Sequence, residues 1–371
     1  MRASGGTLSR DERRDWLRLI RSENVGPIGF FQLLERFGTA AAAIEALPEL
    51  ARRGGRRRLR LATLAEVEQE LAAVEAAGAG LIAFSEPGYP PLLREIADPP
   101  PLISVLGHPA LLGRETVAVV GARNASASGQ RFARQLAAEI AAAGLNVVSG
   151  MARGTDAAAH AGALAHGTIA VLAGGVDVIY PPENEALYHD IVAGGAVISE
   201  MPVGTKATAR HFPRRNRLIS GLALGVVVVE AAPRSGSLIT ARLAAEQGRE
   251  VFAVPGSPLD PRARGANGLI RQGAQLTESA ADVIDAVQRM RERRIEEPRG
   301  AAYGGRPTPP AEAELDQGRQ ALVRLLGPTP VEVDELIRQS ELTPPVVITI
   351  LLELDLAGRL DRHPGNRVSL R

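Results

Sequence analysis

The chain has 371 residues, of which 45% are hydrophobic and 23% charged, a composition typical of a globular protein with a large core. No apolar run approaches the roughly 18 residues of a membrane span, and the N-terminus lacks the apolar stretch of a signal peptide. There are no cysteines, which excludes disulfides, thiolate catalysis and cysteine-bound zinc. We therefore expect a cytoplasmic protein without a membrane partner.

The formal net charge of +1 hides an uneven distribution of charge. Residues 1–60 hold 13 Arg and 7 acidic residues, and residues 201–275 hold 11 basic and 4 acidic residues. Residues 312–371 hold 7 Arg and 10 acidic residues, so the C-terminal region is acidic. Local patches rather than net charge decide where an anion binds, although each basic region also fits an ordinary solvated surface.

Residues 1–75 are predicted to form a helical domain. Two amphipathic helices flank a turn at Asn24, Val25, Gly26 and Pro27, and the basic run 52–60 fits an exposed loop or a helix start. A helix–Gly-turn–helix resembles helix-hairpin-helix and SAM-like modules, whose turn amides can contact a phosphate backbone. A plain helical packing domain remains the alternative.

Residues 80–290 alternate between Val/Ile-rich strands and amphipathic helices. The predicted strands are 81–85, 101–107, 116–122, 145–150, 168–175, 196–201, 224–231, 249–256 and 274–278. Nearly continuous apolar strands separated by helices are typical of a parallel sheet covered on both faces. The predicted fold class is therefore α/β, with a doubly wound, Rossmann-like core.

The C-terminal region is predicted to be a linker followed by a winged-helix domain. Residues 291–312 carry charge, Gly and Pro without periodicity, which is typical of a linker. Residues 313–371 show three helical stretches and then a short hairpin, the winged-helix plan. Because a DNA reader should be basic and this module is acidic, we predict a protein-interaction or regulatory role for it.

Candidate binding residues follow the strands, because ligands of an open parallel sheet bind beyond the C-terminal ends of its strands. Several Gly-rich loops open helices there, and helix N-termini offer unpaired N–H groups to anions. Cationic side chains lie in or beside these loops, and Lys206 among them is the only lysine of the chain. They are Arg123, Arg153, Lys206, Arg214, Arg215, Arg217 and Arg234. Together they predict a polyanion surface; the alternative is that the glycines merely make tight turns.

The identity of the polyanion follows from what the motifs lack. GARNASASG matches neither the dinucleotide G-x-G-x-x-G nor the P-loop, so no nucleotide cofactor is expected. Phe212 within HFPRRNR suits a nucleobase that stacks on an aromatic ring while guanidinium groups hold its phosphates. We expect Arg214 or Arg215 to meet phosphates, and Asn216 and Arg217 to hold a loop in front of the buried strand.

No catalytic or metal site is predicted. Asp156 and His160 share one predicted helix face, but a third ligand is missing. Asp177 and Glu200 follow strands without a nucleophile or base beside them in the sequence, so capping or turn-holding roles fit better.

The motifs VGARNASASG, SGMARGTDAAAH, AGGVDVIYPPEN, HFPRRNRLISGLA, RSGSLITARLAAEQGR and GANGLIRQGA resemble those of the DNA-processing protein A (DprA/Smf) family in order and spacing. The resemblance implies a non-enzymatic recombination mediator that binds single-stranded DNA, loads RecA in natural transformation, acts with single-strand-binding protein and forms homodimers. The DNA-binding residues implied by the motifs and by the strand-end pattern are Gly121, Arg123, Ser126, Ser149, Gly150, Arg153, Gly154, Lys206, Phe212, Arg214, Arg215, Asn216, Arg217, Gly236, Ser237 and Thr240.

Two rival functions remain. The same superfamily resembles nucleotide-cleaving phosphoribohydrolases, whose G-G-x-G-T-x-x-E loop carries a catalytic glutamate. Here the loop is RSGSLIT with Thr240 in that position, so the acid/base group is missing. The other rival is a duplex binder that acts through the winged helix and residues 10–60; Phe212 argues against it, because stacking needs unpaired bases.

Overall fold

The computed structural model describes residues 6–296, 312–363 and 365–371. These residues form two compact units. One contains residues 8–69 together with the C-terminal residues from 312 on, and the other contains residues 70–296. Among the described residues no helix is both long enough and apolar enough to cross a bilayer.

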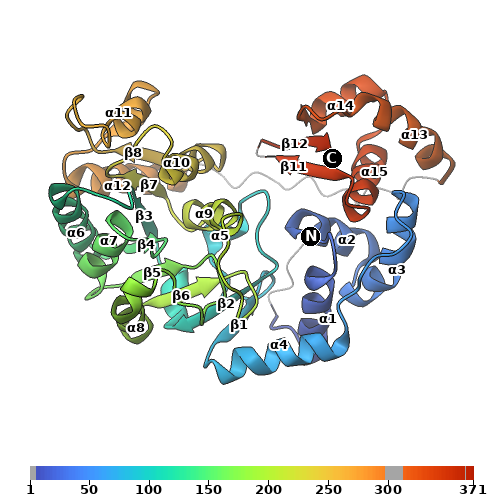
Figure 1. The fold of residues 1–371 in the computed structure, drawn as a ribbon, viewed down its shortest axis with the longest axis horizontal. Helices are drawn as coiled ribbons and strands as arrows, with labels where there is room; N and C mark the ends of the chain where they lie inside the picture. The colour runs from blue at the N-terminus through green and yellow to red at the C-terminus, as the bar shows by residue number, and fades with distance from the viewer. Residues whose placement is uncertain (1–5, 297–311, 364) are drawn as a thin grey trace. The chain divides into compact units, whose positions relative to one another are not determined.

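The larger unit is built on one sheet, with the strand order β1-β2-β6-β5-β4-β3-β7-β8-β9 (Figure 1). The strands are β1 (Gly80–Ala83), β2 (Leu102–Gly107), β3 (Thr116–Val120), β4 (Asn146–Ser149), β5 (Thr168–Val171), β6 (Ala196–Ser199), β7 (Gly225–Val228), β8 (Glu250–Ala253) and β9 (Gln275–Leu276). Each strand overlaps one of the predicted strands, so the doubly wound core is confirmed.

One edge of the sheet differs from the prediction of a parallel sheet. Strands β3 to β9 pair with one another in parallel. By contrast, β2 pairs antiparallel with β6, and β1 pairs antiparallel with β2. The chain between β1 and β2 contains only the short helix α5 (Pro91–Arg94), and an antiparallel partner needs no long crossover helix.

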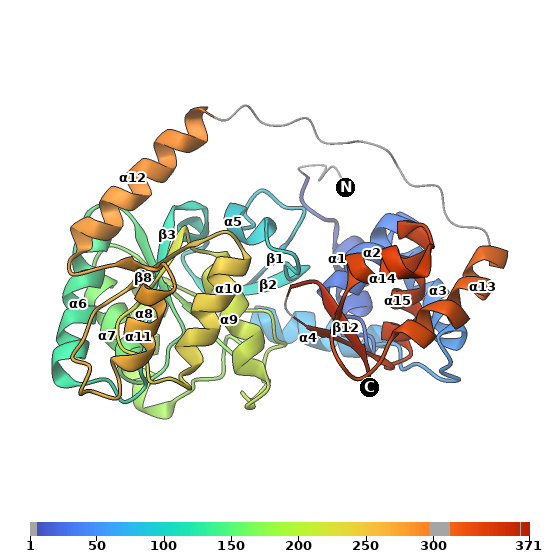
Figure 2. The same cartoon turned by 90° about the horizontal axis from the view of Figure 1, so that it is seen from above.

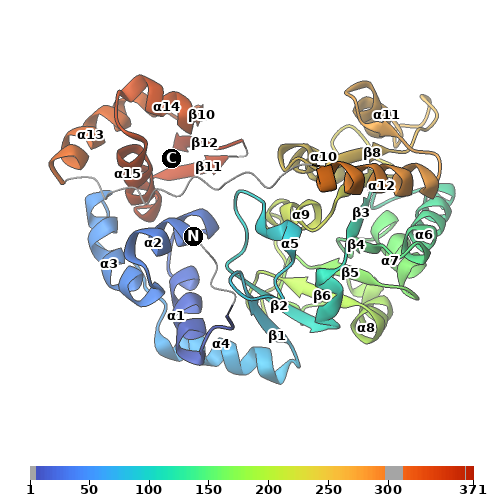
Figure 3. The same ribbon diagram turned by 180° about the vertical axis from the view of Figure 1, so that it is seen from behind.

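Helices cover both faces of this sheet, as Figures 1 and 3 show. Alternate strand residues point to opposite faces: Ala118 and Val120 belong to one buried cluster, and Val117 and Val119 belong to another. The first face packs against α5, α9 (His211–Gly221), α10 (Gly236–Glu246) and α11 (Arg264–Arg271). The second packs against α6 (Ala127–Ala142), α7 (Thr155–Ala163), α8 (Glu185–Gly194) and α12 (Ala280–Glu296).

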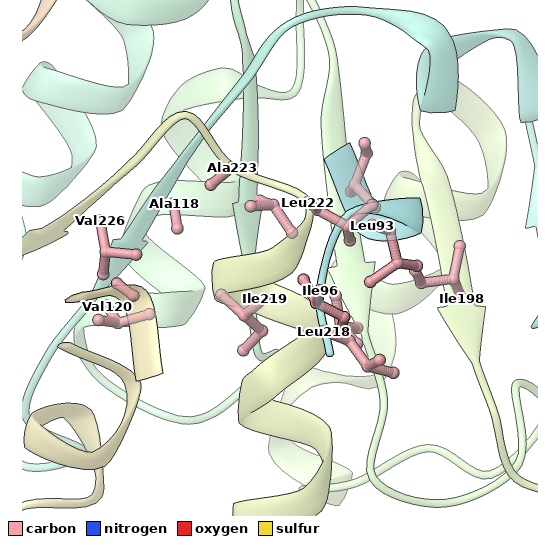
Figure 4. Packing of buried hydrophobic residues seen from close by; sticks show 14 of the residues in the cluster. Leu93, Ile96, Ala118, Val120, Ile198, Leu218, Ile219, Leu222, Ala223 and Val226 are labelled. Carbon is pink, nitrogen blue, oxygen red and sulfur yellow. The ribbon is translucent and has the colours of Figure 1, made fainter. Parts of the chain in front are cut away.

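The stretch 211–221, predicted to be a loop, is the helix α9. Pro213 lies in its first turn, where a missing N–H costs no intrahelical hydrogen bond. Leu218 and Ile219 pack in the same buried cluster as Leu93 and Ile96 (Figure 4). The prediction of a loop was wrong because burial of this apolar side stabilises a helix, and arginine is itself a good helix former.

The smaller unit begins with α1 (Arg10–Arg21), α2 (Pro27–Phe37) and α3 (Ala40–Arg53), and α4 (Leu64–Ala76) leads the chain into the larger unit. Its C-terminal part contains α13 (Glu312–Leu325), β10 (Val331–Glu332), α14 (Val333–Ser340), α15 (Pro344–Leu356), β11 (Leu360–His363) and β12 (Arg367–Leu370), all labelled in Figure 3; Figure 2 shows the three helices from above. The strand order β10-β12-β11 completes the predicted winged helix.

The predicted linker 291–312 begins too early. Helix α12 continues to Glu296, and residues 297–311 lie outside the described residues.

Candidate nucleic-acid interface

A cavity opens where the order of the parallel strands reverses direction. Strand β3 lies between β4 and β7, so the connections that follow β3 and β7 lead away to opposite sides. The cavity measures about 650 Å³ and is lined by residues of the three loops after β3, β4 and β7 and by the first residues of α9 and α10. The cavity lies at the C-terminal edge of the strands, where the sequence predicts that a ligand binds.

The turns after β3 and β4 are in direct contact beneath this cavity. A Cβ atom on Gly121 would lie 2.5 Å from Oγ1 of Thr155, and one on Gly154 would lie 2.5 Å from the carbonyl oxygen of Ala122. Gly154 also has a φ of +74°, which glycine adopts without strain. The backbone N–H of Thr155 donates to the Ala122 carbonyl at 3.2 Å. Both predicted glycines therefore serve the packing of one turn on the other.

The N-terminus of α6 already holds a carboxylate. Ser126 caps this helix by accepting a hydrogen bond from the N–H of Gly129. The backbone N–H and the hydroxyl of Ser126 donate to the carboxylate of Glu230 at 2.9 and 2.6 Å. Because the N–H and the hydroxyl of Ser126 are already bonded to a carboxylate, the structure disfavours the predicted contact of Ser126 with DNA, which stays a prediction.

Buried side chains fill the space behind the turn that follows β4. The hydroxyl of Ser149 is fully buried and donates to the Val119 carbonyl at 2.6 Å. A Cβ atom on Gly150 would overlap the guanidinium of Arg215. The complete burial of Ser149 disfavours its predicted contact with DNA. Gly150 also lines a small pocket together with Arg123, Arg153 and Phe212, so its predicted contact stays a prediction.

Arg215 is an internal cation rather than a phosphate contact. Its side chain is 6% exposed, and Nη1 donates to the carbonyl of Val171 at 2.6 Å. Burial lowers the pKa of Arg215 to about 10, while Asp156 nearby acts in the opposite direction. Burial likewise raises the pKa of Asp156, whose carboxylate accepts a hydrogen bond from the N–H of Ala152.

The N-terminus of α10 is open. Ser235 caps it by accepting from the N–H of Ser237, and Gly236 is exposed with no atom near its missing Cβ. Within the described residues, no carboxylate hydrogen-bonds to its first amides, in contrast to α6. The exposed Arg234 precedes the cap, and Ser237 and Thr240 line the cavity although both are buried. This helix start is therefore the one best suited to a phosphate.

Asn216 and Arg217 fix α9 in place. The side-chain amide of Asn216 donates to the Gly236 carbonyl at 3.3 Å, which ties α9 to the start of α10. Arg217 donates to the carboxylate of Glu200, and its Nε lies 3.2 Å from a carboxylate oxygen of Asp98. Burial opposes the charge of Arg217, but these two carboxylates raise its pKa above the usual range. Both residues hold this segment, as the sequence predicted, although the segment is a helix.

Phe212 stands at the start of α9 between an aromatic and a cationic neighbour. The guanidinium carbon of Arg123 lies 5.0 Å from the centre of its ring, within cation–π distance. The ring of Tyr180 lies 5.6 Å away with a tilt of 55°, and Tyr180 is 46% exposed. A base can therefore stack on the Arg123 guanidinium or on the exposed Tyr180 ring at this position.

Four other predicted cations are exposed. Arg153 lies 3.3 Å from the carboxylate of Glu183, which is a solvent-exposed ion pair. Arg123, Lys206 and Arg214 form no ion pair with any residue that the structure describes. Lys206 lies in the segment between β6 and α9, outside the lining of the large cavity. The side chains of Arg123, Lys206 and Arg214 are therefore available to phosphates.

Two residues of the site escaped the sequence analysis. Tyr180 belongs to the segment after β5, and an aromatic beside two prolines at a strand end was the available signal. Glu230 follows the Val run of β7 directly, so the sequence places its carboxylate at the C-terminal edge of the strands. Its hydrogen bonds with the N–H and the hydroxyl of Ser126 could not be foreseen, because the two residues are 104 positions apart.

His160 is buried and gives the fold a pH dependence. Its Nδ1 lies 2.7 Å from the hydroxyl of Thr168, and that hydroxyl lies 3.0 Å from the Val147 carbonyl oxygen. Burial, followed by Arg215, lowers the pKa of His160 from 6.5 to about 3. Among the described residues no three metal-ligand side chains gather around it or elsewhere.

We expect the stability contributed by neutral His160 to be present above pH 6.5 and to fall as the pH drops toward 3. An unfolded chain takes up the proton in this window and the folded chain does not, so unfolding becomes easier by up to about 1.4 kcal/mol per pH unit. His160→Gln keeps an N–H donor and should flatten the fall in urea stability between pH 7 and 5. His189→Gln, at an exposed position, is the control and should leave this pH dependence unchanged. If the stability of His160→Gln fell with pH as steeply as that of the wild type, His160 would not be the source of the pH dependence.

Family models match most of the chain. A model described as DNA recombination-mediator protein A matches residues 80–288, more than half of the sequence. The chain belongs to this family. A DprA-like N-terminal HHH domain matches residues 10–73, and a DprA winged helix domain matches residues 306–366. The resemblance found in the sequence motifs is thus confirmed.

Relatives of known name support the same assignment. Protein Smf of Escherichia coli is 38% identical over 82% of this chain and 81% of its own length. DNA processing protein DprA of Bacillus subtilis is 45% identical over 58% of this chain and 73% of its own. The crystal structure of DprA from Streptococcus pneumoniae is similar with a TM-score of 0.61 and 34% identity, covering 76% of this chain and 98% of that one.

A further solved family member is DNA processing protein A from Helicobacter pylori, described for its single-stranded DNA binding mode. It matches with a TM-score of 0.53 and 28% identity over 57% of this chain and 96% of its own.

Proposed function

We propose that this protein binds single-stranded DNA along the C-terminal edge of its parallel strands and acts as a recombination mediator. The observation that carries the proposal is the 650 Å³ cavity at the reversal point between β3 and β7, where the exposed Arg123 stacks on Phe212. A stacked aromatic and guanidinium pair suits unpaired bases of any sequence. The membership of the DNA recombination-mediator family supports this function.

The exposed groups at the C-terminal edge of the strands would make two kinds of contact with DNA, one with phosphates and the other with bases. Phosphates would meet the N-terminus of α10 and the exposed side chains of Arg123, Lys206 and Arg214, to which we add Arg234. Bases would stack beside Phe212, with Tyr180 as a second aromatic surface. Asn216, Arg217 and Arg215 would act through α9, which they hold against the sheet and the start of α10.

A comparison of single-stranded and duplex DNA tests this function. We expect the full chain to bind oligo-dT more tightly than a duplex of equal length, because the stacked pair needs unpaired bases. Fluorescence anisotropy with both ligands at one salt concentration is the measurement. Duplex binding as tight as that of oligo-dT would refute the proposal and favour a duplex binder.

We further propose that the bound strand is passed to RecA, with single-strand-binding protein as a second partner, and that two copies of the chain assemble. RecA filament formation on DNA coated with single-strand-binding protein, with and without this protein, tests the first part. The exposed Leu259 and Leu276 support an association through residues 250–280, and light scattering gives the mass in solution.

We propose that the protein is not an enzyme. Thr240 takes the position of the phosphoribohydrolase glutamate, and it is 2% exposed. The one carboxylate that lines the large cavity among the described residues is Asp156, which is buried and hydrogen-bonded to the Ala152 N–H. Release of adenine from AMP would contradict this part of the proposal.

A further inference from the structure

Helix α15 of the winged-helix domain is buried on two sides. On one side Val347, Ile350 and Leu354 belong to the core of the winged-helix domain itself. On the other, Leu352 and Leu356 are at most 2% exposed although they lie outside that core. Their spacing of four residues places them on one face of the helix. A helix that is apolar on both sides needs a partner on each.

The partner on the second side is the N-terminal helical domain. Helix α15 packs against α2 and α3, and a Cβ atom on Gly29 would lie 3.4 Å from Cδ1 of Leu352. A Cβ atom on Gly54 would overlap the carbonyl oxygen of Glu353 and lie 2.8 Å from Cβ of Ala357. Gly54 has a φ of −71°, which any residue adopts, so only this close approach requires glycine there.

Polar groups are matched across the same contact. The side-chain amide of Asn24 donates to the Leu356 carbonyl at 2.9 Å, and Arg359 donates to the Gly54 carbonyl at 3.3 Å. Each domain thus satisfies a carbonyl at the end of a helix in the other. The carboxylate of Glu353 is fully buried; Arg319 donates to it at 2.7 Å, and Arg36 of α2 interacts with it electrostatically.

In a helix-turn-helix the second helix enters the major groove of DNA, and α15 has that place after α14. Here α15 carries two carboxylates and no Lys or Arg, and only Pro344 and Ile348 on it are exposed. We infer that α15 serves as the docking surface for the N-terminal helical domain, and that the winged-helix domain does not read duplex DNA through it. Residues 8–69 and 312–371 would then open and close as one cooperative body.

The absence of cysteine allows a direct test in the full chain, with one thiol introduced at a time. Ile348→Cys places a thiol on the exposed side of α15, and Leu352→Cys places one on the face that contacts α2. We expect a maleimide to label Leu352→Cys at least about 100-fold more slowly than Ile348→Cys, because a buried thiol reacts only after local opening. Equal labelling rates would overturn the inference.

A second measurement needs no cysteine. Gly54→Ala should speed amide hydrogen exchange in α3 and α15 together by at least about tenfold, since the added methyl separates the two helices. Gly26→Ala is the matched control, because no atom lies within 4 Å of the Cβ position of Gly26. Unchanged exchange in α15 of Gly54→Ala would overturn the inference.

The DNA part of the inference has its own test. Ile348→Glu adds a negative charge to the exposed side of α15, and the affinity of the full chain for a random-sequence duplex should remain within about twofold of the wild type. A larger drop in duplex affinity in Ile348→Glu would show that α15 reads DNA, whatever the outcome of oligo-dT binding.

Discussion

Replacing Arg123 and Lys206 together by alanine is expected to weaken binding of oligo-dT by about 100-fold. Both side chains are exposed and free of ion pairs with described residues, so each can give a charge-assisted hydrogen bond worth roughly a factor of ten. The salt dependence should flatten as well, by about 0.7 units of log–log slope for each phosphate that the protein no longer neutralises. Fluorescence anisotropy at two or more salt concentrations measures both effects.

The control for this variant removes the same charge elsewhere. Arg242 and Arg289 are exposed on α10 and α12, outside the lining of the large cavity. Arg242→Ala with Arg289→Ala should leave affinity and slope close to the wild type. If both double variants lose affinity equally, diffuse positive charge rather than the proposed edge binds the DNA. If neither does, the binding site lies elsewhere.

Replacing Arg217 by alanine is expected to destabilise the larger unit by about 3 kcal/mol or more. The side chain is 7% exposed and faces the carboxylates of Glu200 and Asp98, so alanine would leave two partly buried carboxylates without this cation. The measurement is the urea midpoint of the larger unit, read by circular dichroism. Any weakening of oligo-dT binding should follow from the smaller folded fraction.

Arg214, three residues earlier on α9, is the matched control. It is exposed and forms no ion pair with the described residues. Arg214→Ala should change stability by less than about 0.5 kcal/mol and should still weaken oligo-dT binding. The opposite pattern, with Arg214→Ala unstable and Arg217→Ala stable, would show that the two arginines have been assigned the wrong roles.

Much of the fold could be predicted because its signals are local. Runs such as 116–122 and 224–231 are too apolar to lie anywhere but in a covered sheet, and glycines mark the turns that follow them. The doubly wound pattern also predicts that a ligand binds at the C-terminal edge of the strands, whereas the reversal point between β3 and β7 is known only from the strand order of the structure. The motifs that identify the family are equally local, since each is a short continuous segment.

The roles of individual site residues depended on distances that no pattern contains. In HFPRRNR the sequence alone predicted cations, an aromatic ring and a nucleic-acid edge, and it could not separate Arg214 from Arg215. The tertiary structure turns this stretch into α9, which points Arg214 to solvent and Arg215 to the Val171 carbonyl. The reason is physical: helical periodicity divides the side chains between solvent and core only after the packed face of the helix is known.

The same distinction holds for the helix N-termini and the terminal domains. The sequence by itself determined that several helices begin at one edge and that a winged helix ends the chain. Only the tertiary structure decided that Glu230 closes α6 while α10 stays open, and that α15 is covered by α2 and α3. Segments separated by 104 residues at Glu230 and by 332 at Asn24 meet through packing, and such contacts leave no periodic signal in the sequence.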